Sequence, residues 1–355
     1  MNYNASMIQS FEYYKVDPSS WHDTEQITDI ISCSVDHDSE SNTIDSASFE
    51  MTNNVGECYI RPYLILKQNK EVERIPLGVY LVQTPETNFD GVRSTVSIDA
   101  YSPLMELKEK YPDVGYSITK NTELLSLIPN LVRSNLRAPV NKIAKDEQIL
   151  YDDYVSELDD TWMEFINKLL QNKTKYHICL ADDGSVYFAK NKNVDKNGAV
   201  WNYSSSGSTI LYPEISVKED IYGLPNKIEV IYNDENNYIY SSATNNDPNS
   251  VLSTVSRGRT IVYRESSPSI VGVPSQEELD EYARAMLKKL STITVEITYK
   301  HGYCPVRIGD IVCFDYPEAG LNHVKAKVTK QVLRCEVGCE VSETAVYAKK
   351  LWDGD

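Results

Sequence analysis

The stretch that decides the fold is residues 293–317, ITVEITYKHGYCPVRIGDIVCFDYP. Its first seven residues alternate between apolar and polar side chains, which is the period of a half-buried β-strand. A second apolar run follows at residues 311–314. Gly309 and Asp310 stand between the two runs, and these residue types favour turns. The stretch therefore predicts two strands connected through a β-turn that carries Gly309 and Asp310.

A helix is predicted immediately before this stretch, over residues 275–291. Ser275 and Glu278 have the spacing of a capping box, in which each residue satisfies the backbone N–H of the other. The apolar residues that follow recur at helical spacing on one face: Leu279, Tyr282, Ala283, Met286, Leu287 and Leu290. Beyond this helix the chain alternates with period two to its last residues, which predicts an antiparallel set of strands.

The first part of the chain predicts another β-rich region. Residues 1–110 contain short apolar runs separated by polar turns, a rhythm typical of barrels and sandwiches. Residues 111–215 differ, because DDTWMEFINKLLQN (residues 159–172) has helical periodicity. Asp160 is a candidate cap for this helix, and Asp183 and Gly184 between two apolar runs predict a hairpin. The middle of the chain is therefore predicted to be a small α+β unit.

Together these patterns predict an α+β protein in which β-structure dominates. Two barrel-like antiparallel domains are expected, an N-terminal one over residues 1–110 and a second over residues 216–355 that includes the helix 275–291. The α+β insert, with its helix and hairpin, is expected to occupy residues 111–215 between them. A chain of 355 residues is long enough for two or three domains.

Composition excludes several classes of function. The formal net charge is −17 and no basic cluster is present, so the chain lacks the lysines and arginines that drive tight binding to nucleic acid. Its apolar runs are too short for membrane helices, and its N-terminus does not resemble a signal peptide. The seven cysteines are scattered and odd in number, which indicates free thiols rather than a disulfide framework. We therefore expect synthesis and folding in a cytoplasm, without specific nucleic-acid binding or membrane insertion.

Two patterns in the sequence are candidates for metal sites. Residues 193–198 resemble the start of a calcium-binding loop, but Ser204 occupies the position at which a bidentate glutamate is needed. Zinc would need four ligands brought together in space. The candidates for such a site are His301, Cys304, Cys313, Cys335 and Cys339. A plain turn for the first pattern and strand cysteines for the second are the favoured interpretations, so no metal or cofactor is predicted.

Catalytic motifs are also missing from the sequence. It contains no nucleophile elbow, zinc-protease helix or phosphate-binding loop. Glu157 to Asp160 could supply paired carboxylates for glycoside hydrolysis, but acids at this position are typical of helix capping. A catalytic Cys–His pair formed by residues from distant positions is an alternative that the sequence does not decide, because such partners are not neighbours in sequence. The sequence therefore predicts no catalytic residue.

The order of these features resembles the baseplate-hub proteins of bacteriophage tails, the family that includes late control protein D. In the N-terminal half the resemblance rests on ISCSVDHDSESNTIDSASFEMTN (residues 31–53), IPLGVYLVQTP (75–85) and VSIDAYSPLMEL (96–107). In the C-terminal half it rests on NDPNSVLSTVSRGRTIVY (246–263), on the helix EELDEYARAMLKKL (277–290), and on the turn at Gly309 and Asp310. The likeness covers nearly the whole chain as a pattern of elements rather than as invariant motifs.

The resemblance implies a non-enzymatic structural subunit of the virion. Family members assemble as trimers whose paired barrels form a ring of pseudo-sixfold symmetry between the tail tube and the spike. The implied partners are two further copies of the chain, tail-tube and tape-measure proteins, and spike or tip proteins. Acidic side chains around such a channel would repel passing DNA. The alternatives left open are a peptidoglycan hydrolase of the tail and a module that binds host-surface carbohydrate.

Overall fold

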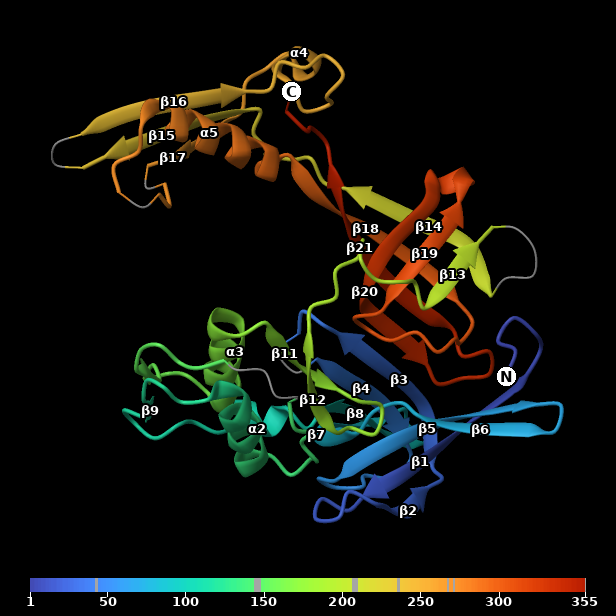
Figure 1. Cartoon of the computed structure of the whole chain (residues 1–355). Coiled ribbons are helices and arrows are strands. Elements are labelled where there is room, and N and C mark those ends of the chain that lie inside the picture. The colour runs from blue at the N-terminus through green and yellow to red at the C-terminus, as the bar shows by residue number, and fades with distance from the viewer. Residues whose placement is uncertain are drawn as a thin grey trace. The chain divides into compact units, whose positions relative to one another are not determined.

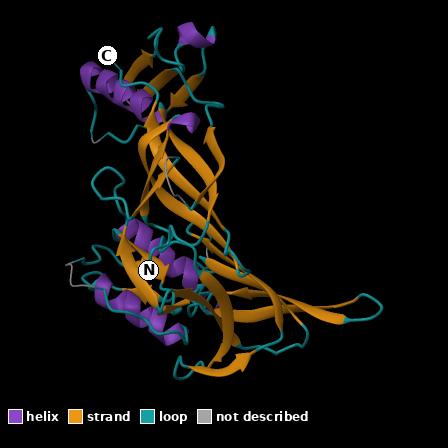
Figure 2. Cartoon of the chain, turned by 90° about the vertical axis from the view of Figure 1, so that its right-hand side faces the viewer, coloured by secondary structure: helices purple, strands orange, loops and turns teal. Residues whose placement is uncertain are grey.

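The computed structural model describes residues 1–41, 44–143, 148–205, 210–234, 237–266, 268–270 and 272–354. Strands dominate these ranges and helices are few, which confirms the predicted α+β, β-dominated class (Figure 2). The chain forms two compact units. The first consists of Met1–Ile215 and Thr298–Ala345, and the second of Ser216–Ile297 and Val346–Asp355.

The N-terminal strands of the first unit form an antiparallel sheet in the order β3-β4-β8-β7-β5-β1-β2, with β6 paired to β5. Every second side chain of a strand points to the core face of this sheet. In β4, for example, Ala47, Phe49 and Met51 are buried, and the residues between them are not. The strands are β1 (Ile8–Val16), β2 (Asp23–Ile27), β3 (Ile30–Asp38), β4 (Asp45–Met51), β5 (Tyr59–Gln68), β6 (Glu71–Pro76), β7 (Tyr80–Phe89) and β8 (Ser94–Tyr101).

C-terminal strands extend the same sheet. Strand β20 (Leu321–Arg334) pairs antiparallel with β3, so that Val332 lies opposite Asp36. Strand β19 (Ile311–Tyr316) pairs with β20 and, in parallel, with β13 (Trp201–Ser204). A 3-10 turn, η1 (Pro317–Ala319), connects β19 to β20. Beyond β20 the order continues β21-β18-β14, and the boundaries between the two units fall within these strands: β14 (Leu211–Glu219), β18 (Thr292–His301) and β21 (Val341–Lys350).

The predicted barrels are wrong. Across the described residues the large sheet runs from β14 at one end to β2 at the other, and no sheet closes on itself. Alternation of side chains reports which face of a strand is buried, but it does not say whether the first and last strands of a sheet pair. The C-terminal strands join the N-terminal sheet instead of forming a barrel of their own. Division into three domains at residues 110 and 215 stays a prediction beside the two contact-defined units.

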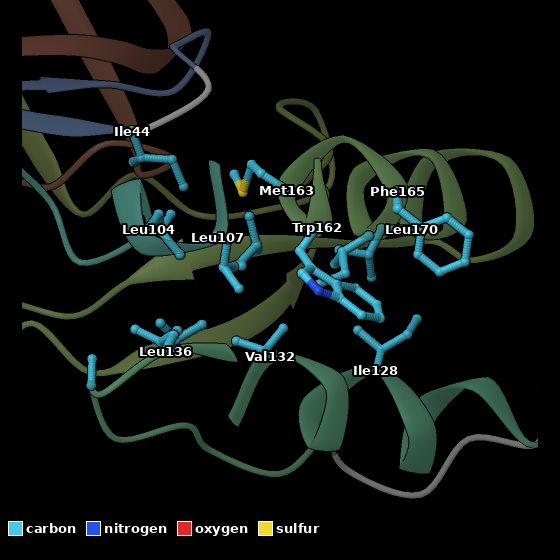
Figure 3. Packing of buried hydrophobic residues seen from close by; sticks show 14 of the residues in the cluster. Ile44, Leu104, Leu107, Ile128, Val132, Leu136, Trp162, Met163, Phe165 and Leu170 are labelled. Atoms are coloured by element: carbon cyan, nitrogen blue, oxygen red, sulfur yellow. The ribbon is translucent and has the colours of Figure 1, made fainter. Parts of the chain in front are cut away.

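The middle of the first unit contains helices packed on a hairpin (Figure 1). Side chains from helices α2 and α3, including Ile128, Val132, Trp162 and Phe165, share one buried cluster (Figure 3). Helix α3 is capped by Thr161 and not by Asp160. The elements are α1 (Met105–Lys108), β9 (Ser117–Ile118), α2 (Leu124–Asn135), β10 (Tyr154–Val155), α3 (Trp162–Lys173), β11 (Tyr176–Leu180) and β12 (Val186–Lys190).

The second unit is a three-stranded sheet, in the order β16-β15-β17, with one face covered by helix α5. The predicted helix is confirmed as α5 (Gln276–Leu290), and Ser275 with Glu278 forms the capping box. The other elements are β15 (Lys227–Asn233), β16 (Tyr238–Thr244), α4 (Thr254–Arg257) and β17 (Val262–Glu265). Throughout the described ranges, every helix is too short or too polar to cross a membrane.

Candidate functional site

The predicted turn at Gly309 and Asp310 is a β-turn over residues 307–310. The Asp310 backbone N–H donates to the Arg307 carbonyl at 3.0 Å, and Gly309 has a φ of +82°. A positive φ at the third position is the requirement of a type II turn, which glycine meets without strain. The Asp310 carboxylate accepts from the Arg307 backbone N–H at 3.1 Å and pairs with Lys192 at 2.8 Å. Backbone hydrogen bonds with Val328 hold the turn against β20.

The turn aims Arg307 at the β11–β12 hairpin. Its guanidinium donates to both carboxylate oxygens of Asp182, at 2.7 and 2.8 Å, in the paired geometry that makes Arg–carboxylate contacts specific. The same group also donates to the Tyr303 hydroxyl at 3.1 Å and to the Val306 carbonyl at 3.0 Å. Arg307 therefore ties the C-terminal strands to the middle of the chain, across 125 residues of sequence.

The hairpin turn is tied to the N-terminal strands as well. The Gly78 backbone N–H donates to the Asp182 carbonyl at 2.9 Å. The Trp21 indole N–H and the Arg61 guanidinium both donate to the Asp183 carbonyl, at 2.8 and 3.1 Å. Three separate parts of the sequence consequently meet at residues 182–185. We call this meeting point the hairpin junction.

Gly184 is required at the hairpin junction for two reasons. Its φ is +78°, and a Cβ placed there would lie 2.6 Å from the Cβ of Val79 and 3.2 Å from the Trp21 ring. Any other residue would strain the backbone at this position, and its Cβ would displace the side chains of Val79 and Trp21. The sequence pattern predicted a hairpin turn here, and the structure adds the close approach.

A cavity of about 490 Å³ lies beside the hairpin junction. One wall comes from the β11–β12 hairpin, in which His177 and Cys179 lie on the same face and Tyr187 lies opposite Cys179. The other walls come from β3 and β4, from the turn that carries Gly309, and from Lys327 on β20. We call it the Lys327 cavity. Its wall is predominantly apolar, and its size is that of a small-molecule site.

Charges around the Lys327 cavity are paired with one exception. Arg307 pairs with Asp182, and His37 lies 2.8 Å from Asp45. Burial opposes protonation of His37, but the Asp45 carboxylate raises its pKa above the ordinary value. Lys327 has no carboxylate partner among the described residues, and its Nζ contacts only Asn191 Oδ1, at 3.4 Å.

The pKa shifts of three groups show which protonation states this cavity favours. Burial lowers the pKa of Lys327, and both burial and the Lys327 charge lower the pKa of His177. Burial raises the pKa of the Cys179 thiol to about 11, so it stays protonated near neutrality and is a poor nucleophile. The Cys179 thiol is therefore not activated as a nucleophile in this cavity.

A second polar centre is buried around Glu343 in the first unit. We define the Glu343 cluster as Tyr203, Tyr299, His301, Cys304, Gln331 and Glu343, all of which are buried. The Glu343 carboxylate accepts from the Tyr299 hydroxyl at 2.5 Å, from the Tyr203 hydroxyl at 3.2 Å and from Gln331 Nε2 at 2.5 Å. His301 Nε2 lies 3.2 Å from the same carboxylate.

His301 is held in its charged form in this cluster. Burial by itself lowers its pKa, but hydrogen bonds with Cys304 and Glu343 and the charge of Glu343 raise the pKa to about 10. Its second nitrogen, Nδ1, lies 2.6 Å from the Gly302 carbonyl, so both ring N–H groups of the protonated form have acceptors. The pKa of Glu343 is correspondingly lowered by His301 despite burial. The cluster is thus an internal ion pair in a polar network.

The zinc candidates are dispersed between separate places. His301 and Cys304 belong to the Glu343 cluster, with 3.8 Å between Cys304 Sγ and His301 Nδ1. Cys335 and Cys339 pack with Cys33 in a hydrophobic cluster, and Cys313 is half-buried on β19. Within the described ranges, no group of three or more histidine, cysteine or acidic side chains is arranged to hold a metal.

The calcium-like segment forms an Asx turn. Asn193 Oδ1 accepts from the backbone N–H groups of Asp195 and Lys196, at 2.9 and 3.2 Å, and Asn197 donates to the Asn193 carbonyl. The oxygen that would face a cation is therefore already used by the backbone.

The acidic residues before α3 are likewise engaged. Lys168 pairs with Glu157 and with Asp160, and Asp160 also accepts from the Glu157 backbone N–H at 3.1 Å. These carboxylates therefore secure the start of α3. The sequence contains no signal for the residues that build the Lys327 cavity, since Asp182, Arg307 and Lys327 lie far apart in the chain and belong to no recognised motif. The sequence predicted two local elements beside this cavity, the hairpin turn at Gly184 and the turn at Gly309, but not the cavity itself.

No protein-family model matches the sequence, and no curated protein sequence does. Solved structures, in contrast, share its fold. A tail protein from Neisseria meningitidis MC58 matches with a TM-score of 0.62 at 10% identity, over 95% of this chain and 97% of that chain. The 43 kDa tail protein of prophage MuSo2 from Shewanella oneidensis matches with a TM-score of 0.61 at 11% identity, over 95% and 98%. A chain of the Francisella PdpA-VgrG complex matches with a TM-score of 0.58 at 11% identity, over 97% of this chain and 53% of that chain. The chain therefore has the fold of these phage tail proteins, as the order of its predicted helices and strands indicated.

Proposed function

We propose that this protein is a structural hub subunit of a phage tail tip or baseplate. In this proposal three copies form a ring that joins the tail tube to the spike or tip proteins, contacts the tape-measure protein, and lets DNA pass. The observation that carries it is the match in fold over nearly the full length of two tail proteins. The VgrG complex among the structural neighbours supports a spike or tip protein as a partner of this chain.

The open sheet supports assembly. At its two ends, β14 and β2 each pair with one neighbouring strand in the described structure. Unpaired strand edges expose rows of N–H and C=O groups that invite pairing with another chain, and proteins commonly cover them. Neighbouring subunits of a ring would cover them here.

The hairpin junction supports a fixed shape for the first unit. Polar contacts from the N-terminal strands and from Arg307 converge on residues 182–185, so three parts of the sequence are held together by directed bonds. An assembly subunit gains from such preorganisation, because surfaces that need no reordering lose less entropy on binding. The role we propose is accordingly non-enzymatic and belongs to the virion, with assembly in the host cytoplasm.

The acidic character of the chain has a place in this proposal. The chain has a net charge of −17. Acidic side chains that face the channel of a ring would repel DNA phosphates, so the genome could pass through without binding. A map of the assembled ring tests this point. An acidic channel wall supports the proposal, and a neutral or basic wall contradicts it.

Imaging tests the assembly itself. The purified chain is examined by negative-stain electron microscopy at rising concentration, alone and with the spike or tip protein encoded with it. We expect closed rings with threefold symmetry, and no release of muropeptides from purified peptidoglycan. Single subunits under all conditions would contradict the hub, and muropeptide release would favour a hydrolase instead.

A further inference from the structure

The Lys327 cavity has an unbalanced charge that the hub function does not use. We propose that this cavity binds an aliphatic monocarboxylate, a ligand with one negative charge and a short apolar body. This inference goes beyond the proposed function and does not depend on it, because every wall of the cavity belongs to the first unit of a single chain.

The charges of the side chains that line the cavity favour a ligand with a single negative charge. The Arg307 guanidinium is neutralised by Asp182, and His37 is neutralised by Asp45. The half-buried ammonium of Lys327 is left over, since it has no acidic partner among the described residues. A desolvated, unpaired cation is costly, and a ligand that supplies one negative charge removes this cost. A dianion such as phosphate would add a second charge beside Asp45 and Asp182, which disfavours it.

Hydrogen-bonding capacity selects a carboxylate. His177 Nδ1 is buried and has no hydrogen-bond partner in the described part of the chain. His177 lines the same cavity as Lys327, and the Lys327 charge acts on its ring. A carboxylate has two acceptor oxygens, so one can accept from the Lys327 ammonium and the other from an Nδ1–H of neutral His177.

The apolar residues of the cavity wall favour a ligand whose uncharged part is aliphatic. Ile44, Ala181 and Ile308 line the cavity together with the protonated thiol of Cys179, which behaves as a small apolar group. These residues come from three separate parts of the sequence. A bound ligand would therefore bridge the segments that the hairpin junction holds together, and it would stabilise the folded chain by mass action.

Isothermal titration calorimetry on the full chain tests the proposal with butanoate, hexanoate and octanoate as probes. We expect the dissociation constant to fall by roughly tenfold for each added pair of methylenes that is buried. Octanol and octylamine serve as matched probes without the negative charge, and both should bind at least about tenfold more weakly than octanoate.

Substitutions in β20 test whether the Lys327 ammonium binds the carboxylate. Lys327→Met should weaken octanoate binding by about tenfold or more, whereas Lys327→Arg, which keeps the charge, should retain most of it. Lys325→Met is the matched control, because Lys325 lies on the same strand, contacts the Asn197 carbonyl and does not line the cavity. Urea unfolding confirms that each variant is folded. The proposal is overturned if octanoate fails to bind at millimolar concentration, if octanol binds equally well, or if Lys327→Met binds as the wild type does.

Discussion

The first unit contains two polar centres, the buried Glu343 cluster and the half-buried Lys327 cavity, and they differ in how their charges are paired. In the cluster, one carboxylate accepts from two tyrosine hydroxyls and Gln331 and faces a protonated histidine, so each charge has its opposite. In the cavity, two ion pairs leave Lys327 without an acidic partner among the described residues, and the buried Nδ1 of His177 has no hydrogen-bond partner among them either. The first centre is complete within the chain, whereas the second is complete only with a ligand.

This contrast separates polar groups that stabilise the fold from polar groups that are available to a ligand. Burial differs between them in degree, since the Glu343 cluster is fully buried, whereas Lys327 and His177 are half-buried. The distinguishing property is whether the chain itself supplies every counter-charge. Substitutions at the two centres should therefore have opposite consequences for stability, and the following changes test that contrast.

Glu343→Ala should have the largest effect. Removing the carboxylate leaves a buried histidine charge and two tyrosine hydroxyls without their acceptor, and breaking a buried ion pair in this way costs about 3–5 kcal/mol. Urea unfolding followed by circular dichroism measures the change in the free energy of unfolding. A loss below about 1 kcal/mol would show that the cluster is not the stabilising centre described here.

The pH dependence of stability should follow His301. Its pKa is about 10 in the folded chain against 6.5 as the ordinary value. Because the folded pKa is the higher one, the stabilisation is complete below pH 6.5 and is lost as the pH rises towards 10. We expect a decrease of a few kcal/mol, since one pKa unit corresponds to about 1.4 kcal/mol. His301→Gln should flatten this profile between pH 6.5 and 10, and an unchanged profile in this variant would rule out His301 as its source.

Gly184→Ala should destabilise more than Gly309→Ala. Both glycines have a positive φ, but a Cβ at Gly184 would meet Val79 at 2.6 Å, whereas a Cβ at Gly309 has no neighbour within 4 Å. Backbone strain of about 1 kcal/mol is expected at both positions, and overpacking adds about 1–3 kcal/mol at Gly184 alone. Equal losses in the two variants, measured by urea unfolding, would mean that close packing at the hairpin junction contributes nothing.

Lys327→Met should have the smallest effect. Replacing an unpaired, half-buried ammonium by an apolar side chain of similar length removes a desolvation cost, so the free energy of unfolding should stay within about 0.5 kcal/mol of the wild type or rise. A loss above about 1 kcal/mol would place Lys327 in a stabilising role and remove the contrast with Glu343.

Local structure could be predicted from the sequence where short-range chemistry decides it. The capping box at Ser275, the hairpin turn at Gly184 and the turn at Gly309 each depend on residues within a few positions of one another. The barrels were predicted wrongly, because the pairing of β20 with β3 joins segments about 300 residues apart and leaves no local trace. The Lys327 cavity was missed for the same reason. Its walls become neighbours only when the hairpin, the turn and β20 meet. Lys327 is one of three lysines in β20, and the sequence gives no sign that its counter-charge is missing.

The central claim is that this protein acts by assembling, and the mass of the purified chain in solution tests it most directly. Light scattering coupled to size-exclusion chromatography, over a wide range of concentrations, gives that mass without reference to shape. The account predicts a species of three times the 40.3 kDa chain mass, formed by the chain alone or on addition of its spike or tip partner. A stable 40.3 kDa monomer under both conditions would contradict it.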